Sequence, residues 1–187
     1  DPFSIAKSLS TAARISNDRM ILGTGIGWQE SEFALVEREF RNRGARCDEM
    51  LEVMRLLMSG EVVEFHGKYF DFPKLQMSPG TVKPVPIWIG GYSDAALKRA
   101  ARHEGWVGSM HDIAGLREIM LKLRREREAI GDGGNAVFLS AANNLVAGDT
   151  NGASDVFVHD RQTGITERVS VSSSGEQGSW DSWLGAV

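Results

Sequence analysis

Two adjacent glycines and a serine mark the point where a short apolar run meets a helical pattern, in "IGGYSDAA" (89–96). Gly90 and Gly91 carry no side chain, so an anion can approach the backbone there. Ser93 lies beside them, and the helix that follows offers N–H groups and the positive end of its dipole, which favour a phosphate group. The glycines can equally serve only to permit a tight strand-to-helix turn. The residues alone favour neither interpretation over the other.

Two other glycine-rich stretches follow apolar runs. In "GTGIGW" (23–28) the spacing is not the G-x-G-x-x-G of dinucleotide sites, so this stretch is weak evidence for such a site. In "GWVGS" (105–109), Gly108 and Ser109 lie at the end of a predicted strand. We expect these two residues to be secondary contributors to an anion pocket.

The stretch "DTNGASD" (149–155) resembles the oxygen-rich first half of a calcium loop. Asp149, Asn151 and Asp155 lie around Gly152, a spacing that lets their side chains converge on a hard cation. The bidentate glutamate that closes an EF-hand loop is missing, because Arg161 stands near its place. Turns rich in Asx and glycine are common without metal, so we favour the interpretation without calcium and assign no metal site.

The histidines are scattered along the chain, and none has a partner at the spacing of zinc-binding helices. Scattered histidines are more often surface or structural residues than ligands or bases. His66, which stands in a predicted hairpin turn, is expected to be exposed. The four are His66, His103, His111 and His159.

The composition is that of an ordinary globular chain without a basic face. Of its 187 residues 42% are hydrophobic, and 25 acidic side chains outnumber 21 basic ones. This balance disfavours nucleic acid and anionic membranes as partners, and no apolar run approaches the roughly 20 residues of a membrane span. The lone Cys47 excludes an internal disulfide and fits a reducing compartment, which predicts a cytoplasmic protein. The absence of an initiator Met suggests a fragment.

Apolar runs and helical patterns alternate up to residue 130, which predicts an α/β fold with a parallel sheet and right-handed crossovers. The clearest helix has an apolar stripe from Cys47 to Met58 and ends at Gly60. Strands are expected at 19–28, 84–91 and 105–109, and a small hairpin at 61–72. Further helices are expected at 31–40, at 94–103 with Ser93 or Asp94 as the cap, and at 113–130 with Asp112 as the cap and Gly131 as the end.

Beyond residue 135 the pattern becomes all-β. "DVFVHD" (155–160) and "ITERVSVSS" (165–173) are strand-like, and "RQTG" between them indicates a turn. Two strands are marginally stable alone and need further strands or a packing partner.

Three stretches together resemble the luciferase-like monooxygenase family, in particular its deazaflavin F420-dependent oxidoreductases. They occur in the family's order and spacing, and the resemblance covers roughly residues 1–130. It implies an α/β fold of the TIM (β/α)8 barrel type, of which this chain would supply the fourth strand through the seventh helix, without the first three strands. The stretches are "RMILGTGIGWQESEF", "RGARCDEMLEVMRLLMSGEVVEFHGKYFDF" and "PVPIWIGGYSDAALKRAARHEGWVG".

The same resemblance implies a cofactor and its site. F420, or alternatively FMN, would bind at the C-terminal face of the barrel strands, and Gly90, Gly91 and Ser93 would contact its phosphate. The glycines of 23–27 would line the barrel. Trp28 stands where the sugar-phosphate-oxidising branch of the family has an acidic proton donor, which argues against that chemistry.

Two departures from the family limit what the resemblance implies. "HEGWVG" (103–108) lacks one residue of the Gly-Asp-Gly that usually precedes the aromatic residue, which puts the ligand contacts of that loop in doubt. The residues that approach the reactive face of the cofactor come partly from the early barrel strands. No catalytic residue is therefore assigned.

The C-terminal part resembles a different family. Residues 141–187 are similar to one incomplete repeat of TolB-like or WD40-like β-propellers, with "DVFVHDRQTG" as the hairpin of a partial blade. The domains expected are therefore 1–130, a luciferase-like barrel fragment, and 141–187, a partial propeller repeat. Residues 131–140 would be a linker or a seam in a chimeric chain.

Two functions of different classes follow. The first is an oxidoreductase that passes hydride between F420 (alternatively FMN) and a small-molecule substrate, by positioning the cofactor. The alternative is a non-catalytic fragment, truncated or chimeric, that acts at most as a binding or structural module. About four βα units leave two open sheet edges, and a homo-oligomer would cover them.

Overall fold

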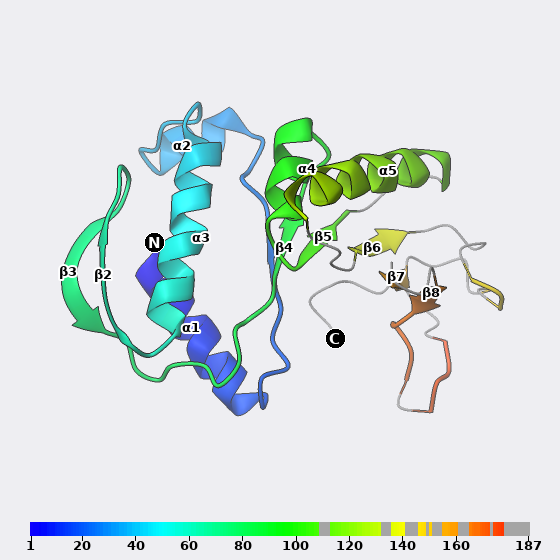
Figure 1. The fold of residues 1–187 in the computed structure, drawn as a ribbon, viewed down its shortest axis with the longest axis horizontal. Helices are drawn as coiled ribbons and strands as arrows, with labels where there is room; N and C mark the ends of the chain where they lie inside the picture. The colour runs from blue at the N-terminus through cyan, green and yellow to red at the C-terminus, as the bar shows by residue number, and fades with distance from the viewer. Residues whose placement is uncertain are drawn as a thin grey trace. The chain divides into compact units, whose positions relative to one another are not determined.

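The computed structural model describes residues 1–108, 113–131, 136–140, 146–148, 150, 155–160, 165–172 and 174–177. The chain folds into two compact units (Figure 1). The first comprises residues 1–22 and 26–86, and the second comprises residues 23–25 and the chain from Ile87 onward.

The first unit begins with helix α1 (Pro2–Ile15), which the sequence patterns above do not predict. Asp1 caps it, since its carboxylate accepts hydrogen bonds from the N–H groups of Phe3 at 3.4 Å and Ser4 at 2.9 Å. Pro2 occupies the first turn, where its missing N–H costs nothing. The Asp-Pro start is therefore the signal that this helix carries in the sequence.

Helix α3 (Arg43–Met58) packs against α1 and carries the predicted apolar stripe. It begins four residues before Cys47, which is partly buried. Gly60 follows the helix with φ +77°, which confirms the predicted end. The buried apolar side chains of this core are Ala6, Ala13, Val53, Met54, Leu57, Met58, Phe72 and Val85.

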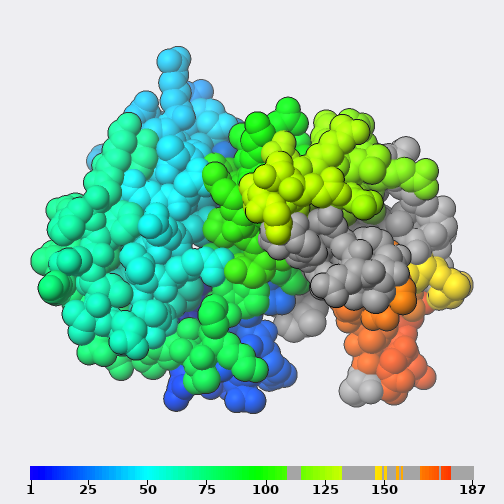
Figure 2. Space-filling model, viewed as in Figure 1, coloured from blue at the N-terminus to red at the C-terminus, as the bar shows by residue number. Residues whose placement is uncertain are grey.

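Helix α2 (Glu30–Leu35) is an exposed helix of the first unit. None of its residues is buried, and Leu35 is 84% exposed. The segment that contains α2 projects from the first unit in Figure 2, where it is sky blue.

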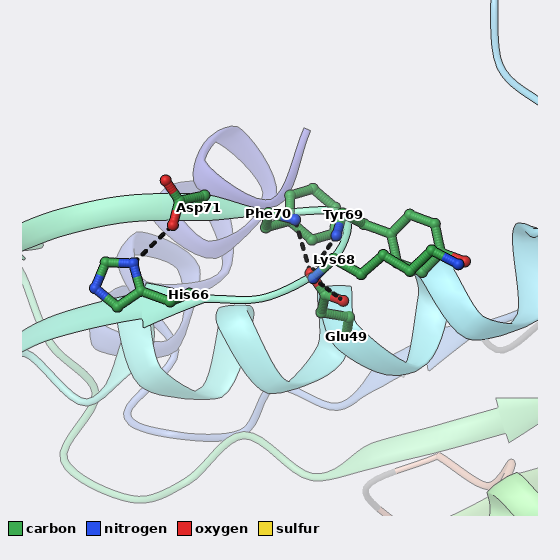
Figure 3. A network of polar contacts seen from close by, with 6 residues as sticks. All are labelled: Glu49, His66, Lys68, Tyr69, Phe70 and Asp71. Atoms are coloured by element: carbon green, nitrogen blue, oxygen red, sulfur yellow. Dashed lines mark hydrogen bonds and ion pairs between the residues drawn. The ribbon is translucent and has the colours of Figure 1, made fainter.

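Strands β2 (Val62–His66) and β3 (Asp71–Gln76) pair antiparallel and form the predicted hairpin. Glu49 of α3 holds the turn between them (Figure 3). Its carboxylate accepts hydrogen bonds from the N–H groups of Lys68 at 3.0 Å, Tyr69 at 2.7 Å and Phe70 at 2.7 Å. A single side chain thus satisfies three successive backbone donors.

The second unit contains a sheet in the order β1-β4-β5. The strands are β1 (Leu22–Thr24), most of which belongs to this unit, β4 (Ile87–Gly90) and β5 (Gly105–Val107). β4 and β5 are parallel and joined by helix α4 (Asp94–Ala101), which confirms the predicted strand–helix–strand order. Helix α5 (Ile113–Ile130) packs against α4, and Gly131 follows it with φ +76°.

The apolar face of α5 contains one cation. Leu116 and Leu123 are buried as the pattern predicts, and so is Arg127, at 0% exposure. Its Nη2 donates to the backbone carbonyl of His103 at 3.2 Å, and at 3.5 Å to that of Ala100. The guanidinium therefore satisfies carbonyls at the C-terminal end of α4, where a cation is favourable.

The C-terminal strands form a second sheet of this unit, in the order β6-β7-β8. β7 (Asp155–Asp160) and β8 (Ile165–Arg168) pair antiparallel, which confirms the predicted hairpin. β6 (Ala136–Ser140) pairs antiparallel with β7 and lies inside the stretch expected to be a linker. That expectation missed a strand because "AVFLS" is a short β-prone run in a glycine- and asparagine-rich setting.

Within the part of the chain that the structure describes, no helix combines the length and the apolar character that crossing a bilayer requires.

Candidate functional site

The candidate site lies at the carboxyl end of β4. Along this strand Ile87 and Ile89 are buried, whereas Trp88 and Gly90 are only partly buried, so the two pairs lie on opposite faces of the sheet. The chain then passes through Gly91 and enters α4 within three residues. The strand end and the helix start are therefore adjacent, as phosphate sites of α/β folds require.

The structural requirement for glycine differs between positions 90 and 91. Gly91 has φ +110°, and a Cβ there would lie 3.1 Å from the Cβ of Ala96, so the turn itself requires glycine. At Gly90 the nearest atom to an added Cβ would be the carbonyl oxygen of Thr24 at 3.4 Å, an ordinary contact. Packing among the described residues does not require glycine at position 90, so a ligand has room to approach there.

Ser93 is the N-cap of α4. Its Oγ accepts a hydrogen bond from the N–H of Ala96 at 3.2 Å, and its backbone is extended. The hydroxyl hydrogen is still available for donation, since a hydroxyl both donates and accepts. Of the two caps that the sequence allowed, the structure selects Ser93.

The N-terminus of α4 has backbone N–H groups that could bind a phosphate. The first helical N–H groups have no partner within their own helix. Among the described residues, only Ala96 in this turn donates to a side-chain cap, and no contact to the N–H groups of Asp94 and Ala95 is seen. Two backbone donors, a hydroxyl and the positive end of the helix dipole thus belong to the residues that follow Gly90 and Gly91.

Asp94 opposes an anion at this site. Its side chain is exposed and stands in the first turn of α4. A carboxylate there interacts favourably with the helix dipole and therefore stabilises the helix. It also repels a phosphate group bound at the same place.

Trp106 of β5 contacts the loop and is a residue that sequence reasoning missed. It is fully buried, and its indole Nε1 donates to the carbonyl oxygen of Gly91 at 2.8 Å. Tyr92 packs edge-on against the indole, with 6.2 Å between ring centroids. The tryptophan of "HEGWVG" signalled a buried aromatic residue, but its partner depends on how β4 and β5 align.

The glycines of "GWVG" make room for tryptophan rings. A Cβ at Gly108 would lie 2.1 Å from the Trp106 ring, and one at Gly105 would lie 2.3 Å from the Trp88 ring. Packing thus explains Gly108, which is buried, and its contribution to an anion pocket stays a prediction. Ser109, its predicted neighbour in that pocket, lies outside the described residues.

Glu104 occupies the position where the loop departs from the family pattern. Its Oε2 accepts a hydrogen bond from the N–H of Ile87 at 2.8 Å. Ile87 is the first residue of β4, and Gly90 is the last, so Glu104 ties down the end of the strand remote from the candidate site.

The first glycine-rich stretch opens into solvent. No atom lies within 4 Å of a Cβ built on Gly23 or Gly25 among the described residues, and Gly27 has φ +75°. Trp28, next in the chain, is 83% exposed. The barrel-lining role of these glycines stays a prediction.

Of the residues considered for calcium, the structure describes only Asp155. Asp155 is fully buried, accepts a hydrogen bond from the Ser170 hydroxyl at 2.6 Å and lies 3.9 Å from the Arg168 guanidinium. Asp149 and Asn151 lie outside the described residues, so the calcium alternative is untested. Among the described residues no group of three or more His, Cys, Asp or Glu side chains is placed to hold a metal.

His66 is exposed, as predicted. It ends β2, and its Nδ1 lies 2.7 Å from the carboxylate of Asp71 on the facing strand (Figure 3). Both side chains are mostly exposed, at 65% and 74%, so this pair is a solvated surface contact.

The chain is similar over most of its length to known proteins. A family model described as luciferase-like monooxygenase matches residues 1–158. The protein Rv0940c of Mycobacterium tuberculosis is 38% identical over 130 residues, which cover 70% of this chain and 45% of the relative. An F420-dependent glucose-6-phosphate dehydrogenase of Amycolatopsis mediterranei is 32% identical over 105 residues, which cover 54% of this chain and 32% of that enzyme. The chain thus spans less than half the length of these relatives.

Solved structures show the same fold. The monooxygenase RslO1 from Streptomyces bottropensis aligns with a TM-score of 0.61 and 26% identity, over 70% of this chain and 41% of its own. An F420-dependent secondary alcohol dehydrogenase, in complex with an F420-acetone adduct, aligns with a TM-score of 0.63 and 20% identity, over 71% and 42%. The described chain is therefore an α/β fold whose neighbours are luciferase-like TIM barrels.

The comparisons do not support the propeller interpretation of the C-terminal part. The family match runs through residues 131–140 and ends at residue 158, inside β7. It gives no support for a propeller repeat or for a chain joined from two families. The resemblance rested on one hairpin, and hairpins of alternating residues with a glycine turn occur in many β-sheets. The domain boundaries at 130 and 141 stay a prediction.

Proposed function

Because this chain belongs to the luciferase-like monooxygenase family, we propose that it binds deazaflavin F420, with FMN as the alternative, and serves hydride transfer to or from a small organic substrate. Two relatives are named as F420-dependent dehydrogenases, one for glucose 6-phosphate and one for hydroxymycolic acid. The observation that carries the proposal is the loop from Gly90 to Ser93 with the adjoining start of α4.

The residues of this loop would hold the phosphate group of the cofactor. Gly90 leaves the backbone open to the anion, and Gly91 turns the chain into the helix. The N–H groups of Asp94 and Ala95 and the hydroxyl of Ser93 would donate to the phosphate oxygens. When bound, F420 or FMN supplies the hydride chemistry in its ring system, and the protein supplies binding and orientation.

We do not propose the sugar-phosphate substrate of the glucose-6-phosphate dehydrogenase for this chain. Trp28 stands where that branch of the family places its acidic proton donor, and an indole cannot donate a proton as a carboxylic acid does. We therefore propose a small organic substrate of another class, and assign no catalytic residue. The lone Cys47 is consistent with the cytoplasm as the proposed location.

Replacing Ser93 with alanine is expected to weaken binding of F420 and FMN by about five- to tenfold, since one donor to a charged group is lost. The same change removes the N-cap and lowers the free energy of unfolding by about 1 kcal/mol. Equilibrium titration and urea unfolding measure the two effects. Ser8→Ala is the control, because Ser8 is an exposed helical serine of the first unit whose hydroxyl donates to the carbonyl of Ser4. Equal cofactor affinities for the wild type and Ser93→Ala would show that Ser93 does not bind the phosphate.

Replacing Asp94 with asparagine is expected to strengthen phosphate binding by about two- to fivefold at low ionic strength, because a like charge in the first turn of α4 is removed. The gain should shrink in 0.5 M salt, because the Debye length falls from about 30 Å at 0.01 M to between about 3 and 10 Å at that salt concentration. Titrations with FMN at both salt concentrations check this. An affinity that does not change at either salt concentration would place the phosphate elsewhere.

The test of the function is titration of the purified chain with F420 and with FMN, followed by cofactor fluorescence, with light scattering on the same sample. Saturable micromolar binding supports the proposal. A folded sample that binds neither cofactor would favour the alternative, a non-catalytic structural or binding module. Light scattering also reports whether the chain associates with a second copy, which could cover β1 at the edge of its described sheet.

A further inference from the structure

We propose that Trp106 is a positioning residue for the phosphate group, because its indole N–H holds the carbonyl of Gly91 toward the buried side of the loop. This inference rests on the proposed function, since it concerns the same loop. It assigns a role to the tryptophan of "GWVG", which neither the motif nor the relatives' names specify.

The hydrogen bond between Trp106 and Gly91 is well defined. The donor and acceptor atoms lie 2.8 Å apart, and the indole is completely buried. Trp106 is the register partner of Ile89, so it lies beside the last residue of β4 before the two glycines. Gly108 leaves space for one edge of the ring, and Tyr92 packs against it. The indole therefore has little freedom to move away from the carbonyl.

The carbonyl of Gly91 needs such a restraint. Glycine adopts positive and negative φ with similar ease, so the peptide after Gly91 can rotate more readily than others. A rotated peptide would turn its carbonyl oxygen, which carries a partial negative charge, toward the start of α4. That oxygen would repel the anion that the N–H groups of Asp94 and Ala95 attract.

The indole N–H opposes this rotation, because a rotated carbonyl would leave a buried donor without its acceptor. The indole N–H therefore influences phosphate binding without contacting the phosphate. Trp106 acts through the orientation of Gly91, and preorganisation of this kind strengthens binding by removing the cost of ordering the loop.

The test compares FMN with riboflavin, which has the same ring system and no phosphate. The wild-type chain should bind FMN more tightly than riboflavin. In Trp106→Phe, which keeps an aromatic ring and removes the N–H, the preference for FMN should fall by about tenfold. The affinity for riboflavin should stay within about twofold of the wild-type value. A general packing defect would instead weaken both ligands together.

A second variant covers the case in which Trp106→Phe does not fold. β-(3-Benzothienyl)alanine introduced at position 106 alone keeps the bicyclic shape and replaces the N–H with sulfur, so it removes only the donor. An unchanged preference for FMN in the folded variant overturns the role of Trp106. A wild-type chain that binds FMN no better than riboflavin overturns the phosphate site itself, and the inference with it.

Discussion

Replacing Gly91 with valine should weaken binding of F420 and FMN by about 100-fold or more. Gly91 has φ +110°, a conformation that a β-branched residue strongly disfavours. Its Cβ would also lie 3.1 Å from the Cβ of Ala96, inside the first turn of α4. The loop must rearrange to relieve strain of about 1–3 kcal/mol, and the rearranged loop no longer presents the glycine turn to the phosphate. Fluorescence titration with both cofactors measures the loss.

The matched control is Gly131→Val. Gly131 also has a positive φ, at +76°, but it follows α5 and has no atom within 4 Å of an added Cβ among the described residues. The control should lower stability through backbone strain and leave cofactor affinity within about twofold. If both variants weaken binding equally, strain in the fold and not the loop at Gly91 controls affinity.

Replacing Glu49 with alanine should lower the free energy of unfolding by about 2–4 kcal/mol, the largest stability effect expected in the first unit. The Glu49 carboxylate is the acceptor for three successive N–H groups in the turn between β2 and β3 (Figure 3). Without it these donors must find water or remain unpaired. Urea unfolding measures the loss, and hydrogen exchange should show faster exchange at Lys68, Tyr69 and Phe70.

Glu52→Ala is the matched control for this change. Glu52 lies on the same helix α3 and its side chain is exposed. Both variants remove one acid from one helix, so helix propensity and net charge change alike. The control should alter stability by less than about 0.5 kcal/mol. Equal effects of the two variants would mean that the turn does not depend on the carboxylate.

Sequence patterns predicted those features of the helices that depend on residues close together in the chain. The stripe of α3 ended at Gly60 as the positive φ of that residue requires. Ser93 capped α4 at the position that the Ser-Asp pair allowed. Periodicity and capping depend on residues within one or two turns of each other, so they can be read from the sequence. α1 follows the same rule, since the Asp-Pro pair at its start is a local capping signal.

The long-range contacts of the site and of the rest of the fold were not predictable, because they join residues far apart in the chain. Trp106 reaches the carbonyl of Gly91 only through the parallel register of β4 and β5. Glu49 reaches Phe70 across 21 positions. The burial of Arg127 follows from carbonyls at the end of another helix. In each case the residue type was visible in the sequence, and its partner was decided by packing.

Nuclear magnetic resonance of the 15N-labelled chain tests most directly whether the start of α4 binds the phosphate of a deazaflavin or flavin. On titration with FMN, the amide signals of Gly91, Ser93, Asp94 and Ala95 should shift saturably, and riboflavin at equal occupancy should leave them nearly unchanged. The same signals should shift with F420. If FMN and riboflavin shift the same signals equally, or if FMN shifts only signals elsewhere in the chain, the loop at Gly91 is not the phosphate site.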